Sequence, residues 1–226
     1  EGIRLAREAV RAQAHARMVL HTEQTDARGR GLVNSLARLG AEVEVVTPAV
    51  MAACSATETP PGLLVVVETP EIPLPPQLTF ALLIDGLADP GNMGTILRSA
   101  WAAGVEAIFL TAGTVDPFNP KVVRAAAGAH FDLPLLTIEA EGLPPSLAGL
   151  DLWVAQARAG QPYTAVDWRL PAALVIGSEA EGPHRWLVEA AAGLVHIPMR
   201  HSTESLNAAM AASILLFEVA RQRGHA

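Results

Sequence analysis

Three short segments of the chain combine glycine, carboxylate and amide groups at spacings that suit ligand binding. The first runs from Asp85 through a Pro-Gly turn into a predicted helix, with Asn92 as the expected N-cap and Arg98 about two turns further on. The start of such a helix can hold a phosphate group. The same residues also fit a turn, a helix cap and a surface arginine without any ligand.

The second segment is a glycine-bracketed acidic loop between Gly177 and Pro183. Glycines let a backbone approach a ligand closely, whereas the carboxylates of Glu179 and Glu181 would repel a phosphate. A neutral or cationic ligand therefore suits this loop better, although an ordinary strand-to-helix turn explains the same pattern.

The third segment places Glu204, Ser205 and Asn207 at the predicted start of a long C-terminal helix. Polar side chains at this place are common as helix caps, and they can equally face a bound molecule.

All three segments follow strands of a predicted α/β domain. Strands expected at 80–84, 107–110, 133–137, 152–155, 173–176 and 194–197 alternate with helices that begin near Asn92, Asn119, Pro183 and Ser205. This order predicts a mostly parallel sheet covered on both faces, which binds ligands beyond the carboxyl ends of its strands. The segments after residues 84, 176 and 197 should therefore meet at one edge of the sheet.

Residues 1–69 are predicted to form a separate small α/β domain. Helices at 3–16 and 31–39 and a helical turn at 49–54 alternate with strands at 18–22, 43–46 and 63–67. Residues 70–78 carry four prolines and form a stiff linker, so the second domain spans 79–226. Because the chain starts at Glu1 rather than at a methionine, we expect further natural residues upstream.

Composition narrows the classes of protein that remain. Half of the residues are hydrophobic and 17% are charged, which excludes a disordered chain, and no apolar run approaches the ~20 residues of a membrane span. A single cysteine, Cys54, excludes an internal disulfide and favours a cytoplasmic protein. The net charge of −7 disfavours a polyanionic partner, yet residues 1–40 hold seven arginines against four acidic residues. The basic N-terminal part is therefore the candidate for binding phosphates.

Together, the three segments resemble the signature motifs of the SpoU (TrmH-like) RNA methyltransferases of the SPOUT class. The family motifs resemble N-x-G-x-x-x-R, G-N-E-G-x-G and I-P-M-x-G-x-x-E-S-L-N. The matching positions are Asn92, Gly94 and Arg98 in the first, Gly177, Glu179 and Gly182 in the second, and Ile197, Pro198, Met199, Glu204, Ser205, Leu206 and Asn207 in the third, with departures at Ser178, Ala180 and His201. The stretch 116–128 also resembles a family segment, and residues 1–69 resemble an L30e-like substrate-binding domain.

The resemblance implies an α/β SPOUT fold with a C-terminal trefoil knot, a homodimer, and no metal. It also implies transfer of a methyl group from S-adenosyl-L-methionine to a ribose 2′-hydroxyl of RNA. The implied catalytic residues are Arg98, Asn92, Glu179, Ser205 and Asn207; the implied cofactor contacts are Gly177, Gly182, Ile197, Met199 and Leu206; and the expected RNA contacts are Arg4, Arg7, Arg11, Arg28, Arg30 and Arg124.

Family members are thought to use the first-motif arginine as the base, but a guanidinium is too weak an acid to fit that role well. Holding a phosphate and stabilising the developing alkoxide demands less of Arg98. We expect an rRNA target, with 23S favoured. The alternatives are a tRNA ribose or base methyltransferase, and an inert RNA-binding protein that retains the fold.

Overall fold

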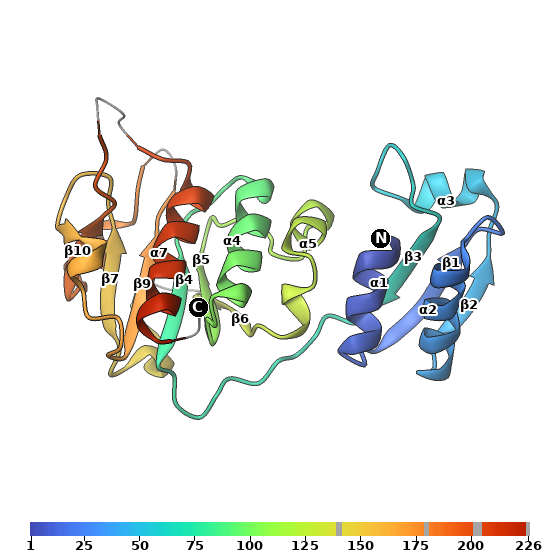
Figure 1. The fold of residues 1–226 in the computed structure, drawn as a ribbon, viewed down its shortest axis with the longest axis horizontal. Coiled ribbons are helices and arrows are strands. Elements are labelled where there is room, and N and C mark those ends of the chain that lie inside the picture. The colour runs from blue at the N-terminus through green and yellow to red at the C-terminus, as the bar shows by residue number, and fades with distance from the viewer. Residues whose placement is uncertain (139–141, 179–180, 201–204, 225–226) are drawn as a thin grey trace. The chain divides into compact units, whose positions relative to one another are not determined.

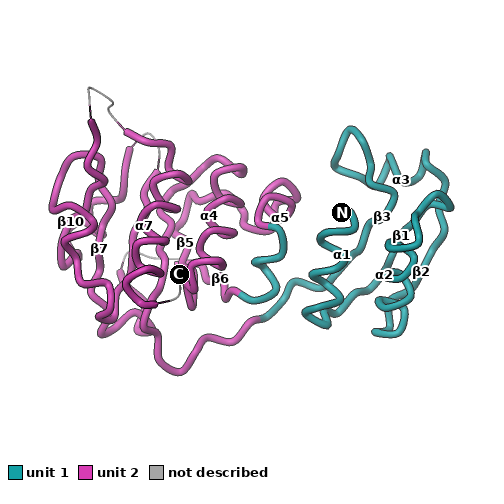
Figure 2. The backbone as a smooth tube through the Cα atoms, viewed as in Figure 1, with its two compact units in different colours: residues 1–71, 127–132 teal, residues 72–126, 133–226 magenta. Residues whose placement is uncertain are grey.

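The chain forms two compact units in a computed structural model that describes residues 1–138, 142–178, 181–200 and 205–224. One unit comprises Glu1–Glu71 with Ala127–Asp132, and the other comprises Ile72–Ala126 with Leu133–Ala226 (Figure 2). Each unit has its own sheet, and each is described by itself below.

The first unit is a three-stranded sheet with helices packed on it. Its strand order is β2-β1-β3, with β2 parallel and β3 antiparallel to β1. Val19, Leu36 and Leu63 are fully buried in its core. The elements follow the predicted order: α1 (Gly2–Arg11), β1 (Ala16–His21), α2 (Ala27–Arg38), β2 (Glu42–Val45), α3 (Pro48–Cys54) and β3 (Leu63–Val67).

The second helix, α2, begins four residues earlier than predicted. Arg28 and Arg30, which precede the helix predicted at 31–39, lie in its first turn. The reason is Asp26, whose carboxylate accepts a hydrogen bond from the Gly29 N–H at 2.7 Å and so caps the helix. Both arginines are exposed on a helix rather than in a loop.

The second unit contains a seven-stranded parallel sheet of order β6-β5-β4-β9-β7-β10-β8 (Figure 1). Every residue of β4, β5 and β9 is buried, as expected for central strands covered on both faces. The strands are β4 (Phe80–Ile84), β5 (Ala107–Thr111), β6 (Leu135–Ile138), β7 (Asp151–Ala155), β8 (Gln161–Pro162), β9 (Ala172–Ile176) and β10 (Gly193–His196).

The helices of this unit are α4 (Pro90–Ala102), α5 (Pro120–Ala126), α6 (Arg185–Glu189) and α7 (Ala208–Gln222), with 3₁₀ turns at Ala129–Phe131, Pro145–Leu147 and Tyr163–Ala165. Helix α6 packs through Leu187 on one face of the sheet, against Leu83 and Val175. Helix α4 contacts both α5 and α7, and Figure 1 shows α4 and α7 in front of the central strands.

Gly94 explains how closely α4 and α5 approach each other. A Cβ at this position would clash with the Cβ of Ala125 and would lie 2.8 Å from the carbonyl oxygen of Val122. The glycine of the first motif is therefore required by helix packing in this structure.

Candidate active site

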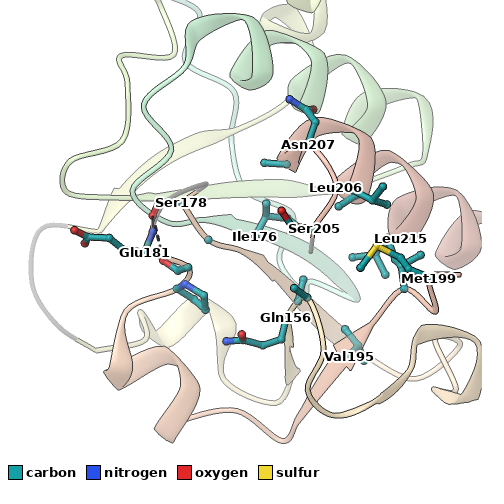
Figure 3. Close-up of a pocket in the computed structure, with 18 residues that line it drawn as sticks. Gln156, Ile176, Ser178, Glu181, Val195, Met199, Ser205, Leu206, Asn207 and Leu215 are labelled. Carbon is teal, nitrogen blue, oxygen red and sulfur yellow. Dashed lines mark hydrogen bonds between the residues drawn. The ribbon is translucent and has the colours of Figure 1, made fainter. Parts of the chain in front are cut away.

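A pocket of about 620 Å³ lies beyond the carboxyl ends of β7, β9 and β10. This is the edge at which a parallel sheet binds ligands, and the volume is typical of small-molecule sites. Figure 3 shows Ser178 and Glu181 on one side and Leu206, Met199 and Leu215 on the other. The second and third segments therefore meet around one cavity.

The predicted cofactor contacts all line this pocket: Gly177, Gly182, Ile197, Met199 and Leu206. Two of the predicted catalytic residues, Ser205 and Asn207, line it as well, whereas Asn92 and Arg98 do not. Glu179 lies outside the described residues, as do Ala180, His201 and Glu204.

The loop after β7 also lines the pocket, although none of its residues is among the predicted site residues. It contributes Gln156, which carries an amide (Figure 3), and Ala157, and they follow Ala155 at the end of β7, which also lines the pocket. These residues form no recognisable motif. Their position directly after the predicted strand 152–155, at the same edge of the sheet as the other two loops, is the one feature of the sequence that could have predicted them as pocket residues.

The two described ends of the loop between Gly177 and Pro183 are joined by hydrogen bonds to Ser178. The Gly182 N–H donates to the Ser178 carbonyl at 3.1 Å, and the Glu181 N–H donates to the Ser178 hydroxyl at 3.1 Å. A Cβ at Gly177 would lie 2.7 Å from Cδ of Pro183, and Gly182 has a φ of +71°. Ser178, where the family has asparagine, thus stabilises the turn, and Gly177 is needed for the loop to close on itself.

The first and third segments are joined by two asparagines. Asn207 is the N-cap of α7, and its Oδ1 accepts hydrogen bonds from the N–H groups of Ala209 and Met210 at 3.0 and 3.2 Å. Its Nδ2 donates to Oδ1 of Asn92 at 2.9 Å. Helix α7 therefore starts at Ala208, three residues later than predicted, because the side chain of Asn207 caps it.

The prediction that Asn92 caps α4 was wrong. The N-cap is Asp89, whose carboxylate accepts a hydrogen bond from the Asn92 N–H at 2.7 Å, with Pro90 at the first helical position. The side chain of Asn92 thereby reaches Asn207 instead of the helix backbone.

Arg98 is exposed on α4, six residues after Asn92. Among the residues that the structure describes, it forms no hydrogen bond or ion pair. Its guanidinium is thus available to an external anion. Arg124, by contrast, is half-buried on α5 and has a buried Nη1, which leaves less of its guanidinium for a nucleic acid.

The remaining predicted RNA contacts lie in the first unit. Arg4, Arg7 and Arg11 are exposed on α1, and Glu8 forms ion pairs with Arg7 at 3.5 Å and Arg11 at 2.8 Å. Arg30 on α2 donates to the carbonyl of Thr25.

Within the described ranges, no group of three or more His, Cys, Asp or Glu side chains is placed to hold a metal ion. No helix in this part of the chain is long and apolar enough to cross a bilayer.

Comparison with known proteins decides the family. The model of the SpoU rRNA methylase family matches residues 79–217, which is more than half of the chain. The chain belongs to this family. A second model, of the MRM3-like substrate binding domain, matches residues 1–65. The predicted resemblance, the α/β fold class and the prediction of a methyltransferase are thereby confirmed.

The curated relatives include a 23S rRNA (guanosine(2553)-2′-O)-methyltransferase, RlmP, from Bacillus subtilis. It is 31% identical over 221 residues, which cover 97% of this chain and 86% of the relative. An uncharacterized tRNA/rRNA methyltransferase from Synechocystis is 37% identical over 186 residues, covering 79% of this chain and 67% of the relative.

Solved structures match over both units. The SpoU methyltransferase AviRb from Streptomyces viridochromogenes, in complex with AdoMet, is 27% identical with a TM-score of 0.85 and covers 100% of this chain and 90% of its own. An AdoMet-bound rRNA methyltransferase from Sinorhizobium meliloti is 28% identical with a TM-score of 0.85, covering 98% and 85%.

Proposed function

We propose that the chain transfers a methyl group from S-adenosylmethionine to a ribose 2′-hydroxyl of rRNA, with 23S rRNA favoured. The observation that carries this proposal is the meeting of the second and third motifs around one pocket, together with the Asn207–Asn92 hydrogen bond that joins them to the helix of Arg98. Relatives named as 23S rRNA 2′-O-methyltransferases support the choice of substrate.

The pocket residues fit the cofactor in size and chemistry. Ile176, Val195, Ile197 and Leu215 give apolar walls for a nucleoside. When bound, the cofactor supplies a methyl group on a positively charged sulfur. Gly177 and Gly182 keep the backbone of the loop close to the space that the cofactor would fill.

We assign Arg98 to the phosphate next to the reacting ribose. Its guanidinium offers several N–H donors in a planar fork, so it is suited to hold an anion and to stabilise negative charge that develops on the 2′-oxygen. Asn92, Asn207, Ser205 and Glu179 are assigned to position the ribose and Arg98. These roles make Arg98 essential for transfer and unnecessary for cofactor binding.

The arginines of α1 and α2 are assigned to the RNA, because the model of a substrate binding domain covers them. If phosphates are their partners, Arg4→Ala and Arg28→Ala should each weaken RNA binding and lower its salt slope by about one counterion. Arg169→Ala is the matched control, since Arg169 is an exposed arginine of the second unit that already pairs with Asp167 at 2.7 Å.

We also propose a homodimer that uses α7. Met210 and Phe217 are 58% and 48% exposed, and their spacing of seven residues puts them on one helix face. Sedimentation of the intact chain should show a dimer that Phe217→Glu dissociates; a monomeric wild-type protein would contradict this. The trefoil knot implied by the resemblance remains a prediction.

The test of function is methyl transfer from labelled S-adenosylmethionine to total rRNA and total tRNA, followed by nucleoside analysis. A labelled 2′-O-methylnucleoside from rRNA supports the proposal. Label in tRNA alone, or on a base, would support the alternative substrates. Calorimetric titration that detects no cofactor binding would favour an inert RNA-binding protein.

A further inference from the structure

A fully buried carboxylate lies beside the pocket loop and has no part in the roles assigned above. Asp85 directly follows β4 and is 0% exposed. Its Oδ1 accepts hydrogen bonds from the Thr111 hydroxyl at 2.6 Å and from Nδ1 of His184 at 2.7 Å. Its Oδ2 accepts the backbone N–H of His184 at 2.6 Å. Three donors thus stabilise a charge that would otherwise be costly to bury.

Two of these three hydrogen bonds come from one residue at the end of the pocket loop. His184 follows Pro183 directly and is the N-cap residue of α6. Its ring and its backbone both donate to Asp85. These hydrogen bonds hold the C-terminal end of the loop, at Pro183, next to the end of β4.

The near end of the loop lies against Asp85 and its neighbour Gly86. The Asp85 N–H donates to the carbonyl of Ile176 at 2.9 Å, one residue before Gly177. A Cβ at Gly86 would lie 3.6 Å from Cβ of Ser178 and 4.0 Å from Cε1 of His184. The Asp85–Gly86 backbone therefore contacts both ends of the loop that lines the pocket.

We propose that Asp85 and His184 are positioning residues that hold the two described ends of the pocket loop, Gly177–Ser178 and Glu181–Pro183, in the arrangement that binds the cofactor. This inference rests on the proposed function. The pair acts through the loop and touches neither the cofactor nor the ribose in this assignment.

Asp85→Asn keeps the shape of the side chain but replaces one acceptor oxygen with an amide donor, so only one of the two His184 N–H groups, that of the ring or that of the backbone, keeps an acceptor oxygen. We expect S-adenosylmethionine to bind about ten-fold more weakly or worse, since hydrogen bonds to a charged group are lost. The KM for the cofactor should rise by the same factor. At saturating cofactor, kcat should stay within about three-fold of wild type, because the reacting residues are untouched.

His184 allows a test that leaves the buried carboxylate in place, because its side chain is 56% exposed. His184→Ala removes the ring donor and keeps the backbone one, so its affinity should lie between wild type and Asp85→Asn. His184→Asn places an amide N–H near the position of Nδ1, and it should restore affinity to within about three-fold of wild type.

Two variants separate positioning from general stability. Thr111→Val removes the hydroxyl that donates to the same carboxylate. The Gly86 N–H, which also donates to Thr111 at 3.2 Å, keeps the Thr114 hydroxyl as an acceptor at 3.1 Å, so Tm should fall without a change in the cofactor KM. Arg185→Ala is a surface control on α6, where Arg185 pairs with Glu189 in solvent.

Calorimetric titration of the variants of this chain with S-adenosylmethionine, together with steady-state kinetics on rRNA, tests the positioning role. If the wild-type chain does not bind the cofactor, the proposed function itself is wrong. If wild type binds and either Asp85→Asn binds equally well or Thr111→Val weakens binding to the same extent, the positioning role is overturned. Weaker binding in Asp85→Asn with rescue by His184→Asn supports it.

Discussion

Asn207 donates a hydrogen bond to Asn92 across 115 residues of sequence, while its side-chain oxygen caps the helix that it precedes. One amide thus fixes the start of α7 and the first turn of α4 relative to each other. The two functions use different atoms, and single substitutions can separate them.

We predict that Asn207→Asp keeps the helix cap and impairs catalysis. A carboxylate still accepts the N–H groups of Ala209 and Met210 and is favoured at a helix N-terminus, so Tm should not fall. It cannot donate to Asn92, so methyl transfer should drop by about ten-fold or more. Asn207→Ala should lose both functions and about 1 kcal/mol of stability. Thermal unfolding and the transfer assay measure the two effects, and full activity in Asn207→Asp would contradict the role of the bond.

Arg98→Ala should abolish methyl transfer and leave the affinity for S-adenosylmethionine unchanged, because Arg98 does not line the pocket. Arg98→Lys should fail as well, since an ammonium lacks the planar fork of the guanidinium. Single-turnover assays and calorimetry give the two quantities. Substantial turnover by the alanine variant would remove Arg98 from the site.

Gly94→Ala should destabilise the protein by about 1–3 kcal/mol, because the new methyl group overlaps Ala125 and the Val122 carbonyl in α5. Gly31→Ala is the matched control: Gly31 lies in α2 with open space around its would-be Cβ, and alanine there should be neutral or stabilising by up to about 1 kcal/mol. Chemical denaturation compares the two. If Gly94→Ala unfolded with the same free energy as Gly31→Ala, α4 and α5 would be able to move apart without a loss of stability.

We expect Arg223 to stabilise the C-terminal end of α7 through the hydrogen bonds of its guanidinium. Its guanidinium donates to the carbonyls of Trp168, Leu170 and Thr79 at 2.7–2.9 Å and lies 5.0 Å from the ring centre of Phe80. Arg223→Lys should therefore cost about 1–2 kcal/mol despite keeping the charge.

Burial lowers the pKa of Arg223, but a guanidinium remains protonated at ordinary pH, so the wild-type contacts should not vary between about pH 6 and pH 9. Urea unfolding of wild type and Arg223→Lys at both pH values checks the loss. If the free energy of unfolding of the wild type changed between pH 6 and pH 9 and that change were absent in Arg223→Lys, the role given to Arg223 would be contradicted.

The sequence by itself predicted most of the elements and the residue types of the three segments, although β8 was not among the predicted strands. The strands at 63–67 and 80–84 were predicted with the bounds that the structure has, because continuous apolar runs between turns form buried strands. The starts of α2, α4 and α7 were misplaced by two to four residues. In each case an Asp or Asn cap competed with a neighbouring polar or glycine residue, and only the backbone shows which side chain accepts the N–H groups.

Tertiary structure alone decided which residues meet. Asp85 contacts His184 because β4 pairs with β9, and the β7 loop with Gln156 reaches the pocket because β7 lies between β9 and β10. These neighbours are far apart in the sequence, and local patterns of hydrophobicity carry no information on the order of strands in a sheet. The physical reason is that strand pairing depends on how the helices cover both faces at once, which is a property of the whole packed unit.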